Sequence, residues 1–225
     1  MATLFSNLRD VVKFDLITKG TYDEGSQYNA GAGDDDVVLA KNSTAATKAG
    51  FKIGTTFYAG DGTDYVYGQD LNDVVSGDAG SDVLVGGLGN DTLFGGADND
   101  NLAGGEGNDT LWGGNENDTI SGQNGDDVLR GWLAWGDAGN DTIWGTSNDN
   151  LFGGAGIDRI YGDNSNDRIE GGLGDDTLYG GNENDELSGQ TGHDTLYGGE
   201  GRDYIDGESG EDKLFGGAGD DGISG

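Results

Sequence analysis

The chain has 225 residues, with 43 acidic and 11 basic side chains and a formal net charge of −32 at pH 7. This charge argues against nucleic acid or an anionic membrane surface as a partner, because both would repel it. The absence of Cys excludes disulfides and thiolate metal sites, and no apolar run is long enough for a membrane span or a cleaved signal. Multivalent cations are the natural counter-charge.

Residues 1–57 are expected to form an N-terminal cap that includes a partly degenerate repeat. The alternation of Val12, Phe14 and Leu16 predicts a strand. The end of a solenoid needs a cover, and the residues expected to provide it are Leu4, Phe5 and Leu8. Residues 32–37 read Ala-Gly-Asp-Asp-Asp-Val, which looks like a degenerate repeat, so the repeat region is expected to begin early.

A nonapeptide repeat marked by Asp fills residues 58–225. Asp recurs every nine residues from Asp64 to Asp127 and, with one step of eight, from Asp141 to Asp221, and an aliphatic residue always stands two positions later. The unit reads G-G-x-G-x-D-x-U-x, in which the glycines permit turns with positive φ and the apolar U points inward from a short strand. The pattern predicts an all-β fold, a right-handed parallel β-roll (a β-solenoid) with two repeats per layer and residues i and i+18 stacked.

The interval from Asp127 to Asp141 is fourteen residues and admits two interpretations. One is a nine-residue repeat with an insertion of five, and the other is a full layer with a loop shortened by four near residues 130–136. The second keeps the repeats on two consistent faces and is preferred.

Under that interpretation, the aspartates of both faces are the predicted calcium ligands, because carboxylates and turn carbonyls of adjacent layers would converge on hard oxygen sites. The first face holds Asp73, Asp91, Asp109, Asp127, Asp141, Asp158, Asp176, Asp194 and Asp212. The second face holds Asp64, Asp82, Asp100, Asp118, Asp149, Asp167, Asp185, Asp203 and Asp221.

The middle of the second face, from Asp100 to Asp185, leaves two alternatives open. Its turns replace a glycine with Asp, Glu or Ser, followed by Asn, as in Glu116-Asn117 and Ser165-Asn166. Asn tolerates the left-handed conformation, so these turns could form without metal and stack their Asn side chains. Alternatively, the extra carboxylates, such as Glu116, could strengthen a metal site.

Three residues after each first-face aspartate from Asp91 onward stands a row that is mostly aromatic. Its members are Phe94, Trp112, Arg130, Trp144, Tyr161, Tyr179, Tyr197 and Phe215. The row is interpreted as a cross-strand ladder, and the alternative is a surface that binds a polysaccharide or another cell-surface ligand.

Motifs for catalysis are absent from the sequence. His193 is the only histidine and occupies a variable turn position, so no HExxH zinc site exists, and no G-x-S-x-G nucleophile elbow occurs. Carboxylate pairs are explained by the repeat. The chain is therefore predicted not to be an enzyme.

The repeat Gly104-Gly105-Glu106-Gly107-Asn108-Asp109-Thr110-Leu111-Trp112 resembles that of the repeats-in-toxin family. The resemblance implies several bound Ca²⁺ ions, folding driven by calcium, and secretion from a Gram-negative bacterium through a type I system. It leaves two functions open: a secreted, non-catalytic calcium-binding protein, or a glycan- or surface-binding accessory module of a larger secreted enzyme or adhesin.

Overall fold

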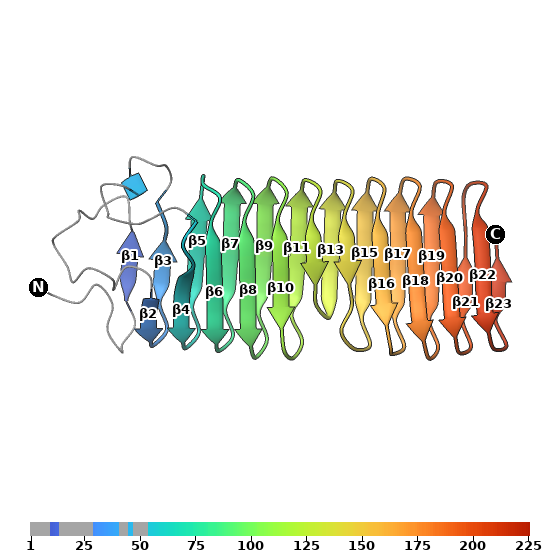
Figure 1. Cartoon of the computed structure of the whole chain (residues 1–225), viewed down its shortest axis with the longest axis horizontal. Helices are drawn as coiled ribbons and strands as arrows, with labels where there is room; N and C mark the ends of the chain where they lie inside the picture. Colours follow the sequence, from blue (N-terminus) through green and yellow to red (C-terminus); the bar gives the residue numbers. More distant parts are fainter. Residues whose placement is uncertain (1–9, 14–28, 41–44, 47–53) are drawn as a thin grey trace, which may run out of the picture. The chain divides into compact units, whose positions relative to one another are not determined.

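The computed structural model describes residues 10–13, 29–40, 45–46 and 54–225, and the chain divides into two compact units, Met1–Thr119 and Ile120–Gly225. In each unit, odd-numbered strands form one parallel sheet and even-numbered strands form another (Figure 1). Their order within each sheet follows the sequence, so every strand pairs with the strand two places along. We call these the odd sheet and the even sheet.

The strands of the first unit are short and regular. They are β1 (Val11–Lys13), β2 (Asn29–Ala32), β3 (Asp36–Val38), β4 (Phe57–Asp61), β5 (Tyr65–Gln69), β6 (Val74–Ala79), β7 (Val83–Leu88), β8 (Thr92–Ala97), β9 (Asn101–Glu106) and β10 (Thr110–Gly114).

The second unit continues the same alternation. Its strands are β11 (Thr119–Asn124), β12 (Val128–Arg130), β13 (Leu133–Ala138), β14 (Thr142–Trp144), β15 (Asn150–Ala155), β16 (Arg159–Asp163), β17 (Arg168–Leu173), β18 (Thr177–Asn182), β19 (Glu186–Thr191), β20 (Thr195–Glu200), β21 (Tyr204–Asp206), β22 (Lys213–Ala218) and β23 (Gly222–Ser224).

The core is formed by buried aliphatic side chains, one from each of the strands β5 to β21. Leu178 in β18 lies beside Leu196 in β20, eighteen residues later, and both are fully buried. Within a strand the neighbours of the buried residue point outward, because successive side chains of a strand alternate between faces. The predicted parallel β-roll with two repeats per layer is therefore confirmed.

The shortened loop between Asp127 and Asp141 is also confirmed. Leu129 in β12 pairs with Ile143 in β14, fourteen residues later, and Ala134 in β13 pairs with Leu151 in β15. An insertion of five residues would have moved every later strand to the opposite sheet.

Residues 1–57 contribute strands to both sheets. Val12 in β1 pairs with Val37 in β3, which pairs with Val66 in β5, and Val37 and Val66 are fully buried. The proposed cover residues Leu4, Phe5 and Leu8 lie outside the described residues, as do Phe14 and Leu16.

Glycine is required where a turn brings two layers together. Gly105 has φ of +121°, and a Cβ at this position would lie 2.0 Å from the carbonyl oxygen of Gly87 in the layer before. A side chain there would meet both a steric clash and an unfavourable backbone conformation.

Candidate metal centre

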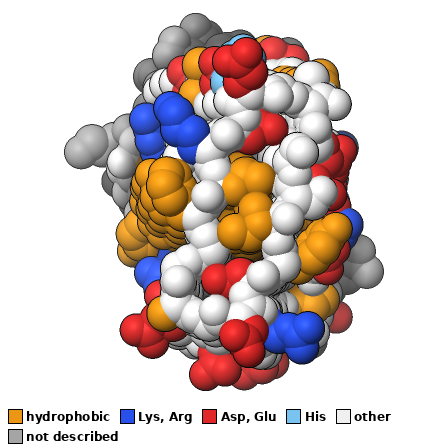
Figure 2. Space-filling model, turned by 90° about the vertical axis from the view of Figure 1, so that its right-hand side faces the viewer, with side chains coloured by type: hydrophobic (Ala, Val, Ile, Leu, Met, Phe, Trp, Pro, Cys, Tyr) orange, Lys and Arg blue, Asp and Glu red, His pale blue; other side chains and the backbone are white. Residues whose placement is uncertain are grey.

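The repeat aspartates lie at the turns, each directly before a strand. The first-face aspartates precede the even strands and the second-face aspartates precede the odd strands. Nearly all of these side chains are buried with 3% or less of their surface exposed, the exceptions being Asp212 and Asp221, which are half-buried. Figure 2 shows acidic side chains gathered at the top and bottom of the molecule, where Figure 1 places the turns.

At most of these aspartates, one carboxylate oxygen joins two layers. The backbone N–H of Asp158 donates to Oδ1 of Asp176 at 2.8 Å, and that of Asp176 donates to Oδ1 of Asp194 at the same distance. On the second face, Asp167 donates in the same way to Asp185 at 2.9 Å. The aspartates of each face therefore form a hydrogen-bonded column within a unit.

The other carboxylate oxygen, Oδ2, is buried and has no hydrogen-bond partner at most positions. This holds for Asp35, Asp64, Asp73, Asp82, Asp91, Asp100, Asp118, Asp141, Asp158, Asp167, Asp176, Asp185, Asp194 and Asp203. Buried acceptors are normally paired, and leaving one unpaired costs about 1–3 kcal/mol, more for a charged group. Because so many unpaired Oδ2 atoms lie at equivalent positions, we infer that these oxygens have a partner other than the protein.

Backbone carbonyls lie beside these oxygens. A Cβ built on Gly86 would be 2.2 Å from Oδ2 of Asp91 and 2.6 Å from the carbonyl oxygen of Gly104. A Cβ built on Gly180 would be 2.4 Å from Oδ2 of Asp185 and 2.6 Å from the carbonyl oxygen of Gly198. Two acceptors therefore face one point without a donor between them, an arrangement that a cation would stabilise.

Burial changes the acidity of the columns. It raises the pKa of Asp73 to about 8, and the neighbouring Asp91 carboxylate adds to the rise. Burial also raises the pKa of six other aspartates to about 7, although backbone N–H donors oppose the shift; these are Asp82, Asp91, Asp100, Asp167, Asp176 and Asp185. Without a cation, the buried aspartates of the folded columns therefore tend to be protonated and neutral instead of ionised.

The donor set fits calcium. Ca²⁺ takes six to eight oxygen ligands from carboxylates and carbonyls in flexible geometry, whereas softer metals prefer sulfur or imidazole. Within the described ranges no three His, Cys, Asp or Glu side chains form a metal-binding group. A calcium ion at these turns would therefore draw its ligands from Asp Oδ2 atoms together with turn carbonyls.

Sequence reasoning missed the first two members of the second-face column. The backbone N–H of Asp10 donates to Oδ1 of Asp35 at 2.6 Å, and that of Asp35 donates to Oδ1 of Asp64 at 2.7 Å. Both residues precede an aliphatic by two positions, in Asp10-Val11-Val12 and Asp35-Asp36-Val37. That local pattern was the available signal, but the intervals of 25 and 29 residues break the period.

Asn columns, which belong to one of the two alternatives for the second face, are present. The N–H of Asn117 donates to Oδ1 of Asn99, and that of Asn184 donates to Oδ1 of Asn166, each at 3.0 Å. The expectation that Asn takes the left-handed conformation is wrong for these four: the positive φ belongs instead to the preceding acidic residue where one is present, as in Glu116 at 73° and Glu183 at 71°. The acidic side chain takes the place of the repeat glycine.

The aromatic row forms a stacked ladder on the outer side of the even sheet. In the second unit, the ring centroids are 4.8–5.8 Å apart and the planes lie within 11° of parallel, through Trp144, Tyr161, Tyr179, Tyr197 and Phe215. In the first unit, Phe94 and Trp112 meet edge to face at 81°. In the stack the ring faces cover one another, so edges face the solvent, as expected for a cross-strand ladder.

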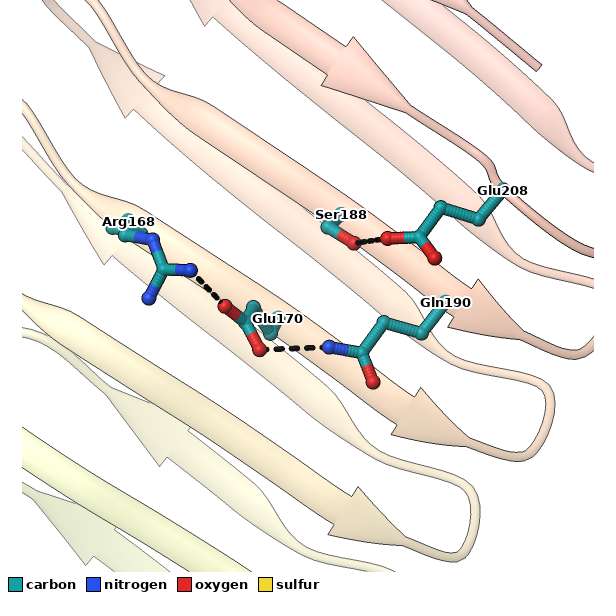
Figure 3. A network of polar contacts seen from close by, with 5 residues as sticks. All are labelled: Arg168, Glu170, Ser188, Gln190 and Glu208. Carbon is teal, nitrogen blue, oxygen red and sulfur yellow. Dashed lines mark hydrogen bonds and ion pairs between the residues drawn. The ribbon is translucent and has the colours of Figure 1, made fainter.

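The outer side of the odd sheet carries one aromatic stack, Trp135 on Phe152 at 5.8 Å, and polar contacts around β17 and β19 (Figure 3). Arg168 forms an ion pair with Glu170, and Nε2 of Gln190 donates to Oε2 of Glu170 at 2.7 Å. Ser188 Oγ donates to Glu208 at 2.5 Å. In the second unit, the long aromatic stack therefore belongs to the even sheet, and the odd sheet combines a shorter stack with polar contacts.

Parallel sheets joined by turns that carry columns of buried carboxylates define a metal-binding β-solenoid. The family model for the RTX calcium-binding nonapeptide repeat, four copies long, matches residues 56–75, 67–102, 76–111, 103–133, 133–151, 145–178, 179–214 and 188–223. The chain belongs to this family and is a calcium-binding protein of the RTX type. No curated protein matches the sequence.

Proposed function

We propose that this chain is a secreted, non-catalytic protein whose folding is driven by calcium after export. The observation that carries the proposal is the set of buried Asp Oδ2 atoms without a hydrogen-bond partner. A metal-free roll must either leave these oxygens charged and unpaired or take up protons, and both reduce its stability at neutral pH. Calcium removes that cost, so binding free energy becomes folding free energy.

The charge of the whole chain acts in the same direction. A net charge of −32 opposes compaction, because closely spaced carboxylates repel one another until a cation neutralises them. A chain of this kind would stay expanded where calcium is scarce and fold where calcium is abundant. This behaviour suits a protein that crosses a membrane unfolded and folds outside the cell.

Export is proposed to follow the type I route of a Gram-negative bacterium. RTX repeats are typical of secreted proteins, and the match to that family is the support for this step. Among the described residues no helix has the length and apolar character needed to cross a membrane.

The absence of catalysis is proposed from the chemistry of the side chains. His193, the only histidine, is exposed at a turn, and its Nδ1 accepts the backbone N–H of Glu211 at 3.0 Å. The buried carboxylates belong to repeating columns and are not a pair in a cleft.

The test is a calcium titration of the metal-free chain at pH 7.5, followed by far-UV circular dichroism. We expect a transition from coil to β-structure with calcium, which chelator reverses. Magnesium at the same concentration is the control and should have little effect, because Mg²⁺ demands near-ideal octahedral geometry and keeps its water.

A β-signal already complete in chelator and unchanged by calcium would contradict the proposal. It would mean that the aliphatic core and the hydrogen-bonded columns are sufficient for folding. Hydrolytic activity in the purified protein that is abolished by a single Asp substitution would contradict the non-catalytic role.

A further inference from the structure

The turn that ends at Asp149 is shorter than its neighbours. Asp149 follows Asp141 by eight residues instead of nine, and the turn reads Gly145-Thr146-Ser147-Asn148-Asp149. It contains only one glycine, whereas the full repeat has three. Asn148 takes a positive φ of 50°, and the preceding strand β14 ends at Trp144.

The carboxylate of Asp149 is held by this turn. The backbone N–H of Thr146 donates to Oδ2 at 2.6 Å, the N–H of Ser147 donates to Oδ1 at 3.1 Å, and the Thr146 hydroxyl donates to Oδ1 at 3.3 Å. Asp149 is buried, yet its Oδ2 is absent from the unpaired oxygens that characterise the columns. Both of its oxygens therefore accept hydrogen bonds.

The next aspartate of the same face shows the usual arrangement. Oδ1 of Asp167 accepts the backbone N–H of Asp149 at 2.8 Å, while its Oδ2 is buried without a partner. Asp185 repeats this pattern. A groove of about 320 Å³ runs past Asp149, Asp167 and Asp185, so access from solvent does not distinguish them.

The layer before Asp149 also lacks a carboxylate in this column. The carbonyl of Trp132 accepts the N–H of Asn150 at 2.9 Å, just as the carbonyl of Asp149 accepts the N–H of Arg168 one layer later. Trp132 therefore occupies the position of the repeat Asp. A cation between these two layers would find neither a carboxylate from Trp132 nor an available Oδ2 from Asp149.

We propose that the second-face row of calcium sites is interrupted at Gly145–Asp149, where backbone N–H groups replace the cation and Asp149 binds no calcium. The row resumes at Asp167. This inference rests on the proposed function, because it assumes that the turns with unpaired Oδ2 atoms hold calcium. On this proposal, the turn of Thr146 and Asp149, together with Trp132 in the layer before it, forms a metal-free place inside a metal-binding roll.

The experiment compares the unsubstituted full chain with Asp149→Asn and, as a matched control, Asp167→Asn. Each protein is folded in excess calcium, equilibrated by dialysis and assayed for bound calcium per chain. We expect Asp149→Asn to bind the same number of ions as the unsubstituted chain, and Asp167→Asn to bind at least one fewer. A crystal structure of the unsubstituted chain in calcium supplies a second measurement that does not depend on how the variants fold.

In that crystal, we expect cations beside the Oδ2 atoms of Asp167 and Asp185 and none in contact with Asp149. A cation bound to Asp149, or an equal loss of calcium in both variants, would overturn the inference. If the unsubstituted chain binds no calcium at all, the proposed function fails, and this result is distinct from either of the others.

Discussion

Oδ1 of Asp176 accepts the backbone N–H of Asp158 at 2.8 Å, while Oδ2 of the same carboxylate is buried without a partner. One side chain thus joins two layers through one oxygen and leaves the other available for a cation. Because this division repeats along each column, with Asp149 as an exception, structural and metal-binding roles are divided between the two oxygens of one side chain.

Replacing Asp176 with Ala should weaken both roles. We expect a loss of stability of about 1–3 kcal/mol from the unpaired N–H of Asp158 alone, and a further loss in calcium because a ligand is removed. The measurement is urea unfolding in excess calcium. Glu200→Gln, an exposed residue, removes one charge without touching a column and should change stability by less than about 0.5 kcal/mol. Equal effects of the two variants would contradict a structural role for the column.

The metal-free chain should be more stable in mild acid than in base. Burial raises the pKa of Asp73 to about 8 and that of Asp176 to about 7, whereas an unfolded Asp titrates near 3.9. Between these limits the folded state binds more protons than the unfolded state, so its stability falls as the pH rises from about 4 to about 8. Far-UV circular dichroism in chelator at pH 5 and pH 8 tests this, because the folded fraction should be larger at pH 5. A larger β-signal at pH 8 would contradict it.

Calcium affinity should show the opposite trend. Protons and calcium compete for the same carboxylates, so calcium binding should weaken as the pH falls below about 7. Calorimetric titration at pH 6 and pH 8 measures both the affinity and the protons released. Binding that is independent of pH over this range would place the cation away from the buried columns.

The aromatic ladder should stabilise the second unit. Tyr179 stacks between Tyr161 at 4.8 Å and Tyr197 at 5.0 Å, and each such pair contributes about 0.5–1.5 kcal/mol. Tyr179→Ala should therefore destabilise the calcium-loaded protein by about 1–3 kcal/mol, whereas Tyr179→Phe keeps both stacks and should be nearly neutral. If the Phe variant loses as much stability as the Ala variant, the hydroxyl carries the effect instead.

Gly105→Ala should disrupt the turn between two layers. A Cβ at Gly105 would lie 2.0 Å from the Gly87 carbonyl oxygen and would also require a φ of +121°. A Cβ at Gly222 would make only ordinary contacts, with Tyr204 at 3.5 Å and the Asp203 carbonyl oxygen at 3.9 Å. We expect the first variant to lower the melting temperature in calcium and Gly222→Ala to leave it nearly unchanged. Similar melting temperatures for both would show that the layers can separate at little cost.

The regular layers were predictable from the sequence because each part of the repeat has its own residue type: Gly and Asp mark the turn, and an aliphatic residue marks the strand. The spacing of Leu178 and Leu196 predicts their pairing, and the phase of the aromatic residues after Trp144 predicts the shortened loop. Both predictions follow from the pattern of apolar residues alone, because a shift of the repeat would move apolar side chains to the outside.

The exceptions were not predictable because they depend on hydrogen bonds. Asp10 and Asp35 join the column across intervals of 25 and 29 residues, which no fixed period detects. The eight-residue step before Asp149 is visible in the sequence, but the three donors on its carboxylate follow from how Thr146 and Ser147 are oriented. The number of repeat aspartates therefore gives an upper limit for the number of bound calcium ions. The geometry of the turns reduces that number.

The carboxylate columns have a direction. In every pair the donor N–H lies in the earlier layer and the accepting oxygen in the later one, as in Asp176 and Asp194. In a roll cut between two layers, the column therefore leaves its Asp N–H groups on one new surface and its Asp carboxylates on the other. Two such fragments complement each other only head to tail, and contact between identical ends would oppose either two sets of donors or two sets of negative charges.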